Sequence, residues 1–362
     1  MTTIQLVSLP GDGIGTEVVD ATLAVLRAAG ERFGFALAVE PVEAGAARYA
    51  RTGVVYTEPD VELCRAADAV LLGALGLPDV LKPDGTEAGP DLQFRLRFDL
   101  DLYAGVRPVE RWAGVPGPLA RSAPWALTIV RENTEGLYAS RGGGTVLRGT
   151  VATDTLVLTA AGVDRIVTWA FEWAAAHPPA AGQPKVTCVD KANVLRSYAF
   201  FRRRFDQVAA RYAGRVGADH QYVDAFVAQL ALAPETVHVA VAENMFGDIV
   251  SDLAGALVGS LGLAPSGDIG ERHAVFQPAH GSAPTLAGKG VANPVATILS
   301  GAMLLEWLAP RKGAPELAEA ARAIHDAVGR ALADPANRTA DLGGRASTAA
   351  CTAAVIAALP RP

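Results

Sequence analysis

The sequence predicts an α/β fold, in which buried strands alternate with helices. At the start of the chain, an apolar run at 4–9 precedes a glycine-rich turn at 10–15 and a helical pattern at 16–29. A second buried run, at 69–73, ends in the small-residue turn 73–76. The stretch 237–255 passes from an apolar run through a polar turn into a helical pattern that starts at Asp248. Strands that lead into helices are typical of a sheet covered by helices.

The composition indicates a globular protein that is long enough for two domains. The chain has 362 residues, of which 50% are hydrophobic and 19% are charged. The net charge of −6 and the lack of a basic cluster argue against nucleic-acid binding. Three scattered cysteines, no leader and no long apolar run predict a reduced, cytoplasmic protein without a membrane span.

Further elements follow from periodicity and from apolar runs. We expect strands at 39–44, 69–73, 125–130 and 185–189, and another that begins at Val275. We expect helices at 155–176, 196–211, 295–308, 315–333 and 348–359, and a loop at 78–90. The basic run Arg202, Arg203 and Arg204 is interpreted as a solvated helix face.

The glycine-rich turn Pro10-Gly-Asp-Gly-Ile-Gly15 places backbone N–H groups at the start of a helix, where they can bind an anion. The turn lacks the Gly-x-Gly-x-x-Gly pattern of the Rossmann dinucleotide fingerprint. On this motif alone, a tight strand-to-helix connection is an equally good interpretation.

Two acids in the stretch 237–255 suggest a metal site. Asp248 and Asp252 are four residues apart, so on a helix they share one face. A hard divalent cation with oxygen ligands would offset their repulsion. The alternative is that they are acids at a helix N-terminus, where they favour the helix dipole.

Arg97, Arg107 and Arg131 are candidates for a carboxylate-binding cluster, because a guanidinium group matches a carboxylate bidentately. The alternative is that each makes a structural ion pair with a nearby acid. These acids are Asp99, Asp101, Glu132 and Glu135. Lys191, at the end of a strand, is either surface decoration or a proton-transfer group.

These motifs resemble those of the β-decarboxylating dehydrogenase family, which includes isocitrate, 3-isopropylmalate, homoisocitrate, tartrate and D-malate dehydrogenases. The resemblance spans nearly the whole chain. It rests on Leu9-Pro-Gly-Asp-Gly-Ile-Gly15, Val106-Arg-Pro108, Arg131-Glu-Asn-Thr-Glu-Gly136, Val189-Asp-Lys-Ala-Asn193, Asn244-Met-Phe-Gly-Asp-Ile-Val-Ser-Asp252, His280-Gly-Ser-Ala-Pro284 and Asn293-Pro294.

The resemblance implies a two-domain, isopropylmalate dehydrogenase-like α/β fold that is not of the Rossmann type. It implies a cofactor-binding domain built from 1–102 and 259–362, and a central domain at 103–258 for dimerisation, metal and substrate. It also implies a homodimer with shared active sites, in which Lys191 and Asp224 reach into the site of the partner.

The resemblance also implies residue roles. Arg97, Arg107 and Arg131 would hold the carboxylates of a malate-type substrate. The catalytic residues would be Tyr138, which protonates the enolate carbon, Lys191, which handles the hydroxyl proton, and Asp224. Asp224, Asp248 and Asp252 would bind Mg²⁺ or Mn²⁺.

The resemblance divides over the substrate. The first half of the chain is similar to tartrate, D-malate and isocitrate enzymes, and the second half to 3-isopropylmalate enzymes. Phe94 lies where the substituent on C3 is read, which favours an apolar or absent group, although Arg95 lies close by. A 3-isopropylmalate-like substrate is favoured. The alternatives are D-malate, tartrate or an isocitrate-like acid, or a catalytically silent regulatory subunit.

The expected cofactor is NAD, with NADP as the alternative. Thr285 stands where NAD-using relatives carry an acid, but no residue in the motif suits a 2′-phosphate. The residues expected to bind the cofactor lie in the glycine turn, at the end of the second strand, in the histidine loop and near the C-terminus. They are Ile14, Gly73, Ala74, His280, Gly281, Ser282, Ala283, Pro284, Thr285, Asn293 and Asp341.

Overall fold

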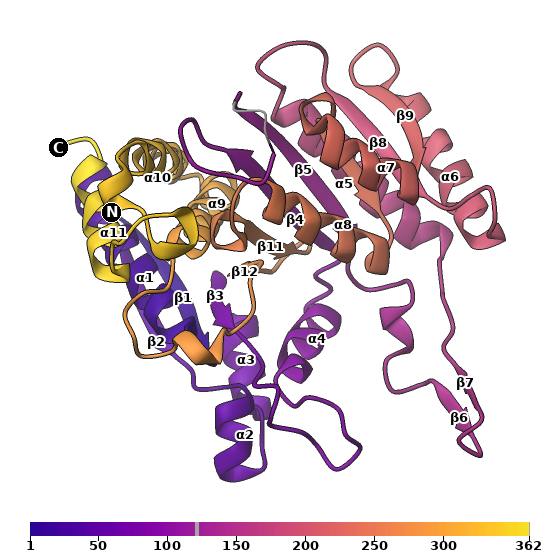
Figure 1. Cartoon of the computed structure of the whole chain (residues 1–362), viewed down its shortest axis with the longest axis horizontal. Coiled ribbons are helices and arrows are strands. Elements are labelled where there is room, and N and C mark those ends of the chain that lie inside the picture. The colour runs from indigo at the N-terminus through magenta and orange to yellow at the C-terminus, as the bar shows by residue number, and fades with distance from the viewer. Residues whose placement is uncertain (120–122, 362) are drawn as a thin grey trace. The chain divides into compact units, whose positions relative to one another are not determined.

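A computed structural model describes residues 1–119 and 123–361 of the chain. The chain divides into two compact units. The first unit comprises Met1–Asp101, Glu110–Pro124 and Val258–Pro362, and the second comprises Leu102–Val109 and Trp125–Leu257. The first unit is therefore built from both ends of the chain, which appear in indigo and yellow in Figure 1.

The first unit contains a mixed sheet with the strand order β2-β1-β3-β12-β11. Strand β1 pairs in parallel with β2 and β3, and β12 pairs in parallel with β3 and antiparallel with β11. The strands are β1 (Thr2–Gly11), β2 (Phe35–Pro41), β3 (Ala69–Ala74), β11 (Pro265–Ile269) and β12 (Ala274–Pro278).

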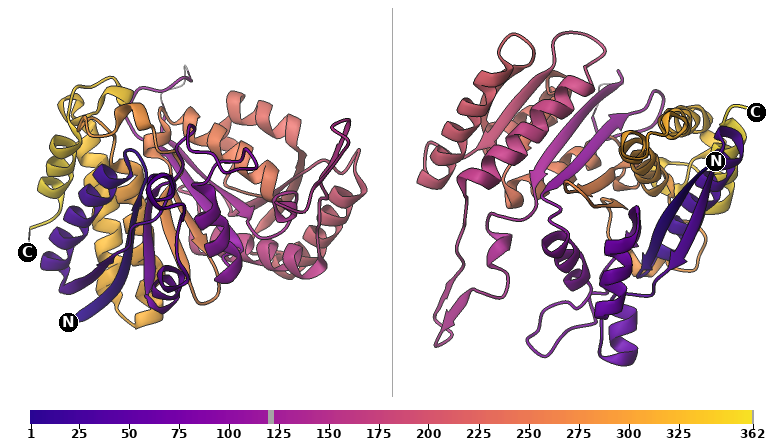
Figure 2. Two further views of the ribbon diagram at one scale, coloured as in Figure 1. Left: turned by 90° about the horizontal axis from the view of Figure 1, so that it is seen from below. Right: turned by 180° about the vertical axis from the view of Figure 1, so that it is seen from behind.

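Helices from both ends of the chain cover this sheet. Helix α9 packs on β12 and α10, and α1 packs on α9 and α11, so that the C-terminal helices lie beside the N-terminal elements (Figures 1 and 2). The helices are α1 (Gly15–Phe33), α2 (Ala46–Thr52), α3 (Glu58–Ala66), α4 (Pro90–Asp99), α9 (Val295–Lys312), α10 (Pro315–Ala333) and α11 (Thr348–Ala358).

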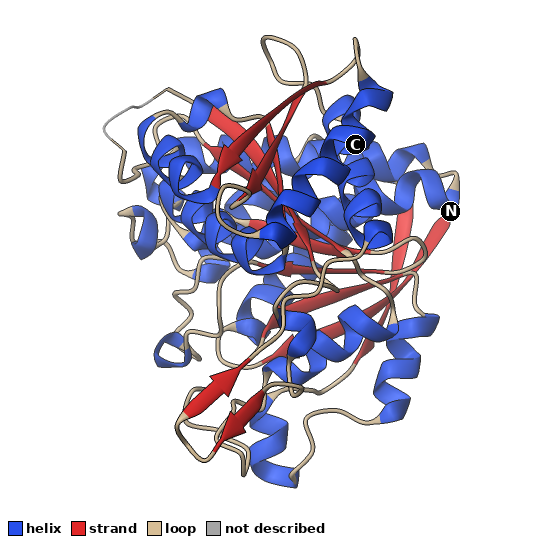
Figure 3. Ribbon diagram, turned by 90° about the vertical axis from the view of Figure 1, so that its right-hand side faces the viewer, coloured by secondary structure: helices blue, strands red, loops and turns tan. Residues whose placement is uncertain are grey.

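The second unit has the strand order β4-β5-β10-β8-β9, with β10 parallel to both β5 and β8, and β8 parallel to β9. A hairpin of β6 (Thr145–Leu147) and β7 (Val151–Thr153) extends from this unit as an arm (Figures 1 and 3). The other elements are β4 (Ala104–Arg111), β5 (Trp125–Glu132), α5 (Ala160–Ala176), β8 (Lys185–Asp190), α6 (Arg196–Ala209), β9 (Gly217–Tyr222), α7 (Val223–Leu232), β10 (Val239–Ala242) and α8 (Asn244–Leu257).

The predicted α/β class is confirmed, and most predicted elements lie within two or three residues of their observed bounds. Several predictions were wrong by four or five residues at one end. The helices expected at 16–29, 155–176 and 295–308 are α1, which ends at Phe33, α5, which starts at Ala160, and α9, which ends at Lys312. The strand expected at 39–44 is β2, which starts at Phe35, and α8 begins at Asn244 rather than at Asp248. In the described part of the chain, no helix is long and apolar enough to cross a membrane.

The observed units differ from the predicted central segment, 103–258, in the placement of Glu110–Pro124. This segment packs on α10 of the first unit. The ring of Trp112 lies 4.8 Å from that of His325, whose Nε2 atom is 2.8 Å from Glu110 Oε2. A Cβ atom at Gly329 would lie 2.6 Å from the indole of Trp112, so glycine makes room for the tryptophan.

Gly15 allows α1 to start directly against the end of β3. A Cβ atom at this position would lie 2.0 Å from the carbonyl oxygen of Pro10 and 2.9 Å from the nitrogen of Ala74. Both contacts are with backbone, which cannot move aside as a flexible side chain can.

Gly15→Ala is therefore expected to lower the free energy of unfolding by about 1–3 kcal/mol, as overpacking does in other cores. Gly217→Ala is the matched control, because the nearest atom to its added Cβ would be 3.6 Å away. Urea unfolding of both variants provides the measurement. Equal stability of the two variants would show that the turn at Gly15 is not crowded.

Candidate active site

Helix α8 begins one turn before the acids that it carries. Glu243, which is fully buried, precedes the helix, and its Oε1 atom accepts a hydrogen bond of 2.9 Å from the backbone nitrogen of Phe246. The hydroxyl of Tyr198 donates to the same oxygen at 2.9 Å. The first turn of α8 contains no acid. The interpretation of Asp248 and Asp252 as acids at a helix start is therefore wrong.

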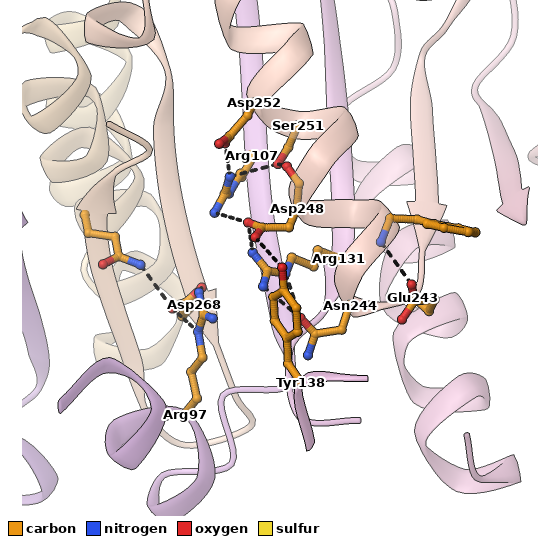
Figure 4. Close-up of polar contacts among 12 residues, drawn as sticks. Arg97, Arg107, Arg131, Tyr138, Glu243, Asn244, Asp248, Ser251, Asp252 and Asp268 are labelled. Carbon is orange, nitrogen blue, oxygen red and sulfur yellow. Dashed lines mark hydrogen bonds and ion pairs between the residues drawn. The ribbon is translucent and has the colours of Figure 1, made fainter. Parts of the chain in front are cut away.

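Two buried arginines lie against the acidic face of α8 (Figure 4). Arg107, from β4, places Nη1 at 2.6 Å from Asp252 Oδ1 and Nη2 at 3.3 Å from Asp248 Oδ1. Arg131, from β5, donates from Nη1 to the same oxygen of Asp248. The side chains of the two arginines are 9% and 2% exposed, so their charges need partners within the protein.

Polar side chains of α8 orient both guanidinium groups. Asn244 Oδ1 accepts from Nε and Nη2 of Arg131, at 3.0 and 2.7 Å. Ser251 Oγ accepts from Nη1 of Arg107 at 2.8 Å. A Cβ atom at Gly247 would lie 2.8 Å from the Cβ of Arg131, so glycine permits this close approach of α8 to β5.

Tyr138 joins the same cluster. Its hydroxyl donates to Asp248 Oδ2 at 3.2 Å, and the guanidinium of Arg131 lies 5.4 Å from the centre of its ring. Burial, and next the charge of Asp248, raise the pKa of Tyr138 above its usual value. The phenol carries its proton at neutral pH, and the raised pKa makes it a weaker acid than a free tyrosine.

The acidic face of α8 fits a divalent cation. Burial raises the pKa of Asp252, and the charge of Asp248 raises it further, against the opposing effect of Arg107. Two oxygen donors that repel each other in this way favour a bound cation, and here the guanidinium of Arg107 bridges both. The described residues include no group of three acidic, histidine or cysteine side chains placed to hold a metal.

Lys191 and Asp224 form a separate ion pair. Lys191 follows β8, Asp224 lies in the first turn of α7, and Nζ and Oδ1 are 2.7 Å apart. The hydrogen bond from Lys191 lowers the pKa of Asp224, whose side chain is 69% exposed. Within one chain, the structure therefore does not gather Asp224 with Asp248 and Asp252 into one group of metal ligands.

The structure corrects the interpretation of 202–204 as a solvated face. Arg202 donates from Nε and Nη2 to the fully buried Asp190, at 2.7 Å in both cases. Arg204 pairs with Asp164 of α5, with its Nε 2.8 Å from Asp164 Oδ1. Only Arg203 is exposed. The pairing of Arg202 fixes the residue that directly precedes Lys191.

In the first unit, Arg97 binds a buried acid. Its Nε atom is 2.8 Å from Oδ2 of Asp268 on β11, and the ring of Phe94 lies 5.8 Å from its guanidinium carbon. Arg95 pairs instead with Glu58 and Asp99 at the surface. The partners of the candidate arginines thus include Asp248, Asp252 and Asp268, which lie far from them in the sequence.

The residues expected to bind a cofactor lie in two groups of the first unit. In one group, Ile14 donates from its backbone nitrogen to the carbonyl of Ser282 at 2.8 Å, and Asp12 donates likewise to Ala74 at 2.6 Å. In the other group, Asp341 Oδ2 accepts from Asn293 Nδ2 at 3.0 Å and from Ser260 Oγ at 2.6 Å.

The histidine loop has two special features. Burial lowers the pKa of His280, and its Nε2 atom has no hydrogen-bond partner in the described parts of the chain. Ala283 has a φ of 37°, a left-handed conformation that is costly for alanine and often marks functional loops. Thr285 follows in a short 3₁₀ turn, Pro284–Leu286.

Several residues of these sites were not predicted. The carboxylate of Asp12, which is 2% exposed, accepts from the backbone nitrogens of Ala46, Ala47 and Gly76 at 2.8–2.9 Å and so fixes two loops. Its place within the glycine turn was a signal for such a role. Asp268 and Gln277 carried no motif, and only the pairing of β11 with β12 brings them together.

Comparisons with known proteins agree along the whole chain. The family profile described as isocitrate/isopropylmalate dehydrogenase matches residues 5–358. A 3-isopropylmalate dehydrogenase from Corynebacterium kroppenstedtii is 40% identical over 94% of this chain and 98% of its own. A decarboxylating D-malate dehydrogenase from Escherichia coli is 38% identical over 96% of each chain.

Solved structures show the same fold. The crystal structure of isocitrate dehydrogenase from Methylococcus capsulatus covers 99% of each chain, with a TM-score of 0.86 and 35% identity. The apo crystal structure of a β-decarboxylating dehydrogenase from Thermococcus kodakarensis covers 98% of this chain and 96% of its own, with a TM-score of 0.77 and 36% identity.

The fold and these matches define a β-decarboxylating dehydrogenase, an oxidoreductase that acts on a hydroxyl group. The chain belongs to the isocitrate/isopropylmalate dehydrogenase family.

Proposed function

We propose that this enzyme oxidatively decarboxylates a 3-substituted (2R)-malate to a 2-keto acid and CO₂, with reduction of NAD. The observation that carries the proposal is the cluster in which the buried Arg107 and Arg131 meet Tyr138, Asp248 and Asp252. It combines carboxylate binding, proton donation and oxygen ligands for a cation in one place.

Asp248 and Asp252 would hold Mg²⁺ or Mn²⁺, together with Asp224 of a second subunit in a homodimer. A cation bound there would lower the pKa of the substrate hydroxyl and stabilise negative charge on the oxygen at C2. The raised pKa of Asp252, caused first by burial and then by Asp248, supports the need for a positive charge at this place.

The arginines bind and orient the substrate. Arg107 and Arg131 are already fixed by Ser251 and Asn244, so little side-chain entropy remains to be lost when a carboxylate binds. Arg97 would add a third guanidinium group for the substrate carboxylates. Phe94, beside Arg97, supports a substrate with an apolar group on C3.

Two residues move protons in this proposal. Lys191, once it has released its own proton, would accept the proton of the C2 hydroxyl, and a bound nicotinamide would supply the acceptor for the hydride of C2. The product of this oxidation would be a 3-carboxy-2-keto acid. Loss of CO₂ from C3 leaves an enolate, and Tyr138 donates its proton to the enolate carbon. The raised pKa of Tyr138, due first to burial and then to Asp248, keeps this proton in place at neutral pH.

The nicotinamide cofactor would bind the first unit. The residues that would hold it lie at the glycine turn, the end of β3, the histidine loop and Asp341. The unpartnered Nε2 of His280 supports a polar ligand there. NAD is favoured over NADP, because the acid Asp341 would repel a 2′-phosphate.

The favoured substrate is 3-isopropylmalate or a close analogue, and the second candidate is D-malate or tartrate. A relative named 3-isopropylmalate dehydrogenase is 40% identical to this chain, and a relative named D-malate dehydrogenase is 38% identical. A silent regulatory subunit is the weakest alternative, because every proposed catalytic residue is present in this chain.

Turnover of a panel of acids tests the proposal. With Mn²⁺ present, we expect the enzyme to reduce NAD when 3-isopropylmalate or D-malate is supplied. Lys191→Ala should lower kcat of this reaction by about 10²–10⁴-fold. Lys185→Ala is the matched control, because Lys185, at the start of β8, also pairs with an acid, Asp219 of β9, at 2.9 Å. No turnover with any acid, or full activity of Lys191→Ala, would refute the proposal.

Replacement of Asp252 tests the metal ligands. The raised pKa of Asp252 means that its protonated form stabilises the native state. This contribution is complete below the ordinary value of 3.8 and is lost as the pH rises through the raised pKa. In EDTA at pH 7, Asp252→Asn should therefore unfold at the same temperature as the parent or above it.

With Mn²⁺ present, the parent should unfold at a higher temperature than Asp252→Asn. A cation at 100 times its Kd stabilises the parent by about 2.7 kcal/mol, whereas the variant should gain much less. Asp164→Asn, which removes the acid paired with Arg204, should keep the full response to Mn²⁺. An equal gain by parent and Asp252→Asn in thermal unfolding would contradict a role for Asp252 as a metal ligand.

A further inference from the structure

Among the candidate arginines, Arg97 is the one whose acidic partner, Asp268, lies on β11. Its Nε and Nη2 atoms are 2.8 and 3.4 Å from the two carboxylate oxygens of Asp268. The side chains of Arg97 and Asp268 are 4% and 3% exposed. At this burial each charge depends on the other, because water cannot replace the partner.

Gln277 fixes the carboxylate of Asp268. Ser266 pairs with Gln277 across the two antiparallel strands, and Asp268 lies two residues further along β11, so Gln277 and Asp268 are diagonal neighbours on one face. The amide of Gln277 donates to Asp268 Oδ2 at 3.1 Å. Asp268 therefore has a fixed orientation before any ligand binds.

The pair determines both the direction and the net charge of the Arg97 side chain. Asp268 engages Nε and Nη2, so the terminal edge with Nη1 is the edge not bonded to this acid. The negative charge of Asp268 offsets the guanidinium charge at close range, where charges interact strongly in a buried setting. Arg97 therefore offers a hydrogen-bonding edge with little excess positive charge.

The other cations on or beside α4 are also matched by acids. Arg95 pairs with Asp99 and with Glu58, the latter at 3.0 Å, and Lys82 pairs with Asp91 at 3.0 Å. Helix α4 thus places no unmatched cation beside Phe94.

We propose that Asp268, held by Gln277, is a specificity-determining residue that limits the Arg97 subsite to malates whose C3 substituent carries no charge. This rests on the proposed function, in which Arg97 contacts the substrate. By offsetting the charge of Arg97, Asp268 selects dicarboxylates over a tricarboxylate such as isocitrate. Asp268 acts on the substrate through Arg97 and is not itself a catalytic residue.

Binding without turnover measures this selectivity directly. Calorimetric titration with D-malate, 3-isopropylmalate and isocitrate, with Mn²⁺ present and nicotinamide absent, gives the affinity ratio of isocitrate to D-malate. Asp268→Asn keeps the shape of the side chain and removes its charge, so the ratio should rise about tenfold. Asp268→Glu keeps the charge and should keep the parental ratio.

Gln277→Glu provides a second test that keeps both Arg97 and Asp268 but replaces the amide beside Asp268 with a carboxylate. The added negative charge should lower the ratio of isocitrate to D-malate instead of raising it. Asp164→Asn is the control, because it breaks a half-buried ion pair between α5 and α6. It should leave the affinity ratio of isocitrate to D-malate unchanged. Equal changes in the affinity for both acids in the Asp268 and Gln277 variants would mean a purely structural role and overturn the proposal.

Binding and turnover measured on the parent enzyme distinguish failure of the Asp268 proposal from failure of the proposed function. A parent that binds D-malate but does not reduce NAD with any acid would refute the proposed reaction, while the binding ratio would still decide the role of Asp268. A parent that binds none of the three acids would overturn both.

Discussion

The requirement to compensate two carboxylates on one face of α8 shapes the second unit. Asp248 and Asp252 lie one helical turn apart, and the buried guanidinium of Arg107 bridges them. Strands β4 and β5 deliver Arg107 and Arg131 to this face, and Gly247 lets α8 approach β5 closely enough for the contact. Strand order, glycine position and ion pairs therefore depend on one another.

The same principle recurs elsewhere in the chain. Asp190 is fully buried and paired with Arg202, and Asp268 is buried and paired with Arg97. Such pairs add little net stability, but removal of one member leaves a buried charge that is costly. In the proposed function these pairs hold arginine and lysine side chains in place before the substrate binds, so the site is preorganised.

The sequence allowed the class, most elements and the motif residues to be predicted, because apolar periodicity and glycine turns are local signals. It did not reveal Asp268 or Gln277, since Asp268 lies 171 positions from Arg97 and Gln277 meets Asp268 only through the pairing of β11 with β12. It also placed the start of α8 too late, because the buried side chain of Glu243 caps the helix. Arg202 was misread for a similar reason: its partner, Asp190, lies on another element.

In the proposed function, Lys191 of one subunit serves the acids of another. Hybrid dimers of Lys191→Ala and Asp252→Asn subunits test this arrangement most directly, because each hybrid would then contain one intact site. Random reassociation of equal amounts makes half of the dimers hybrid, so about a quarter of the parental activity should return. Activity that stays at the level of the separate variants would contradict a shared site and place Lys191 and Asp252 in the same subunit's site.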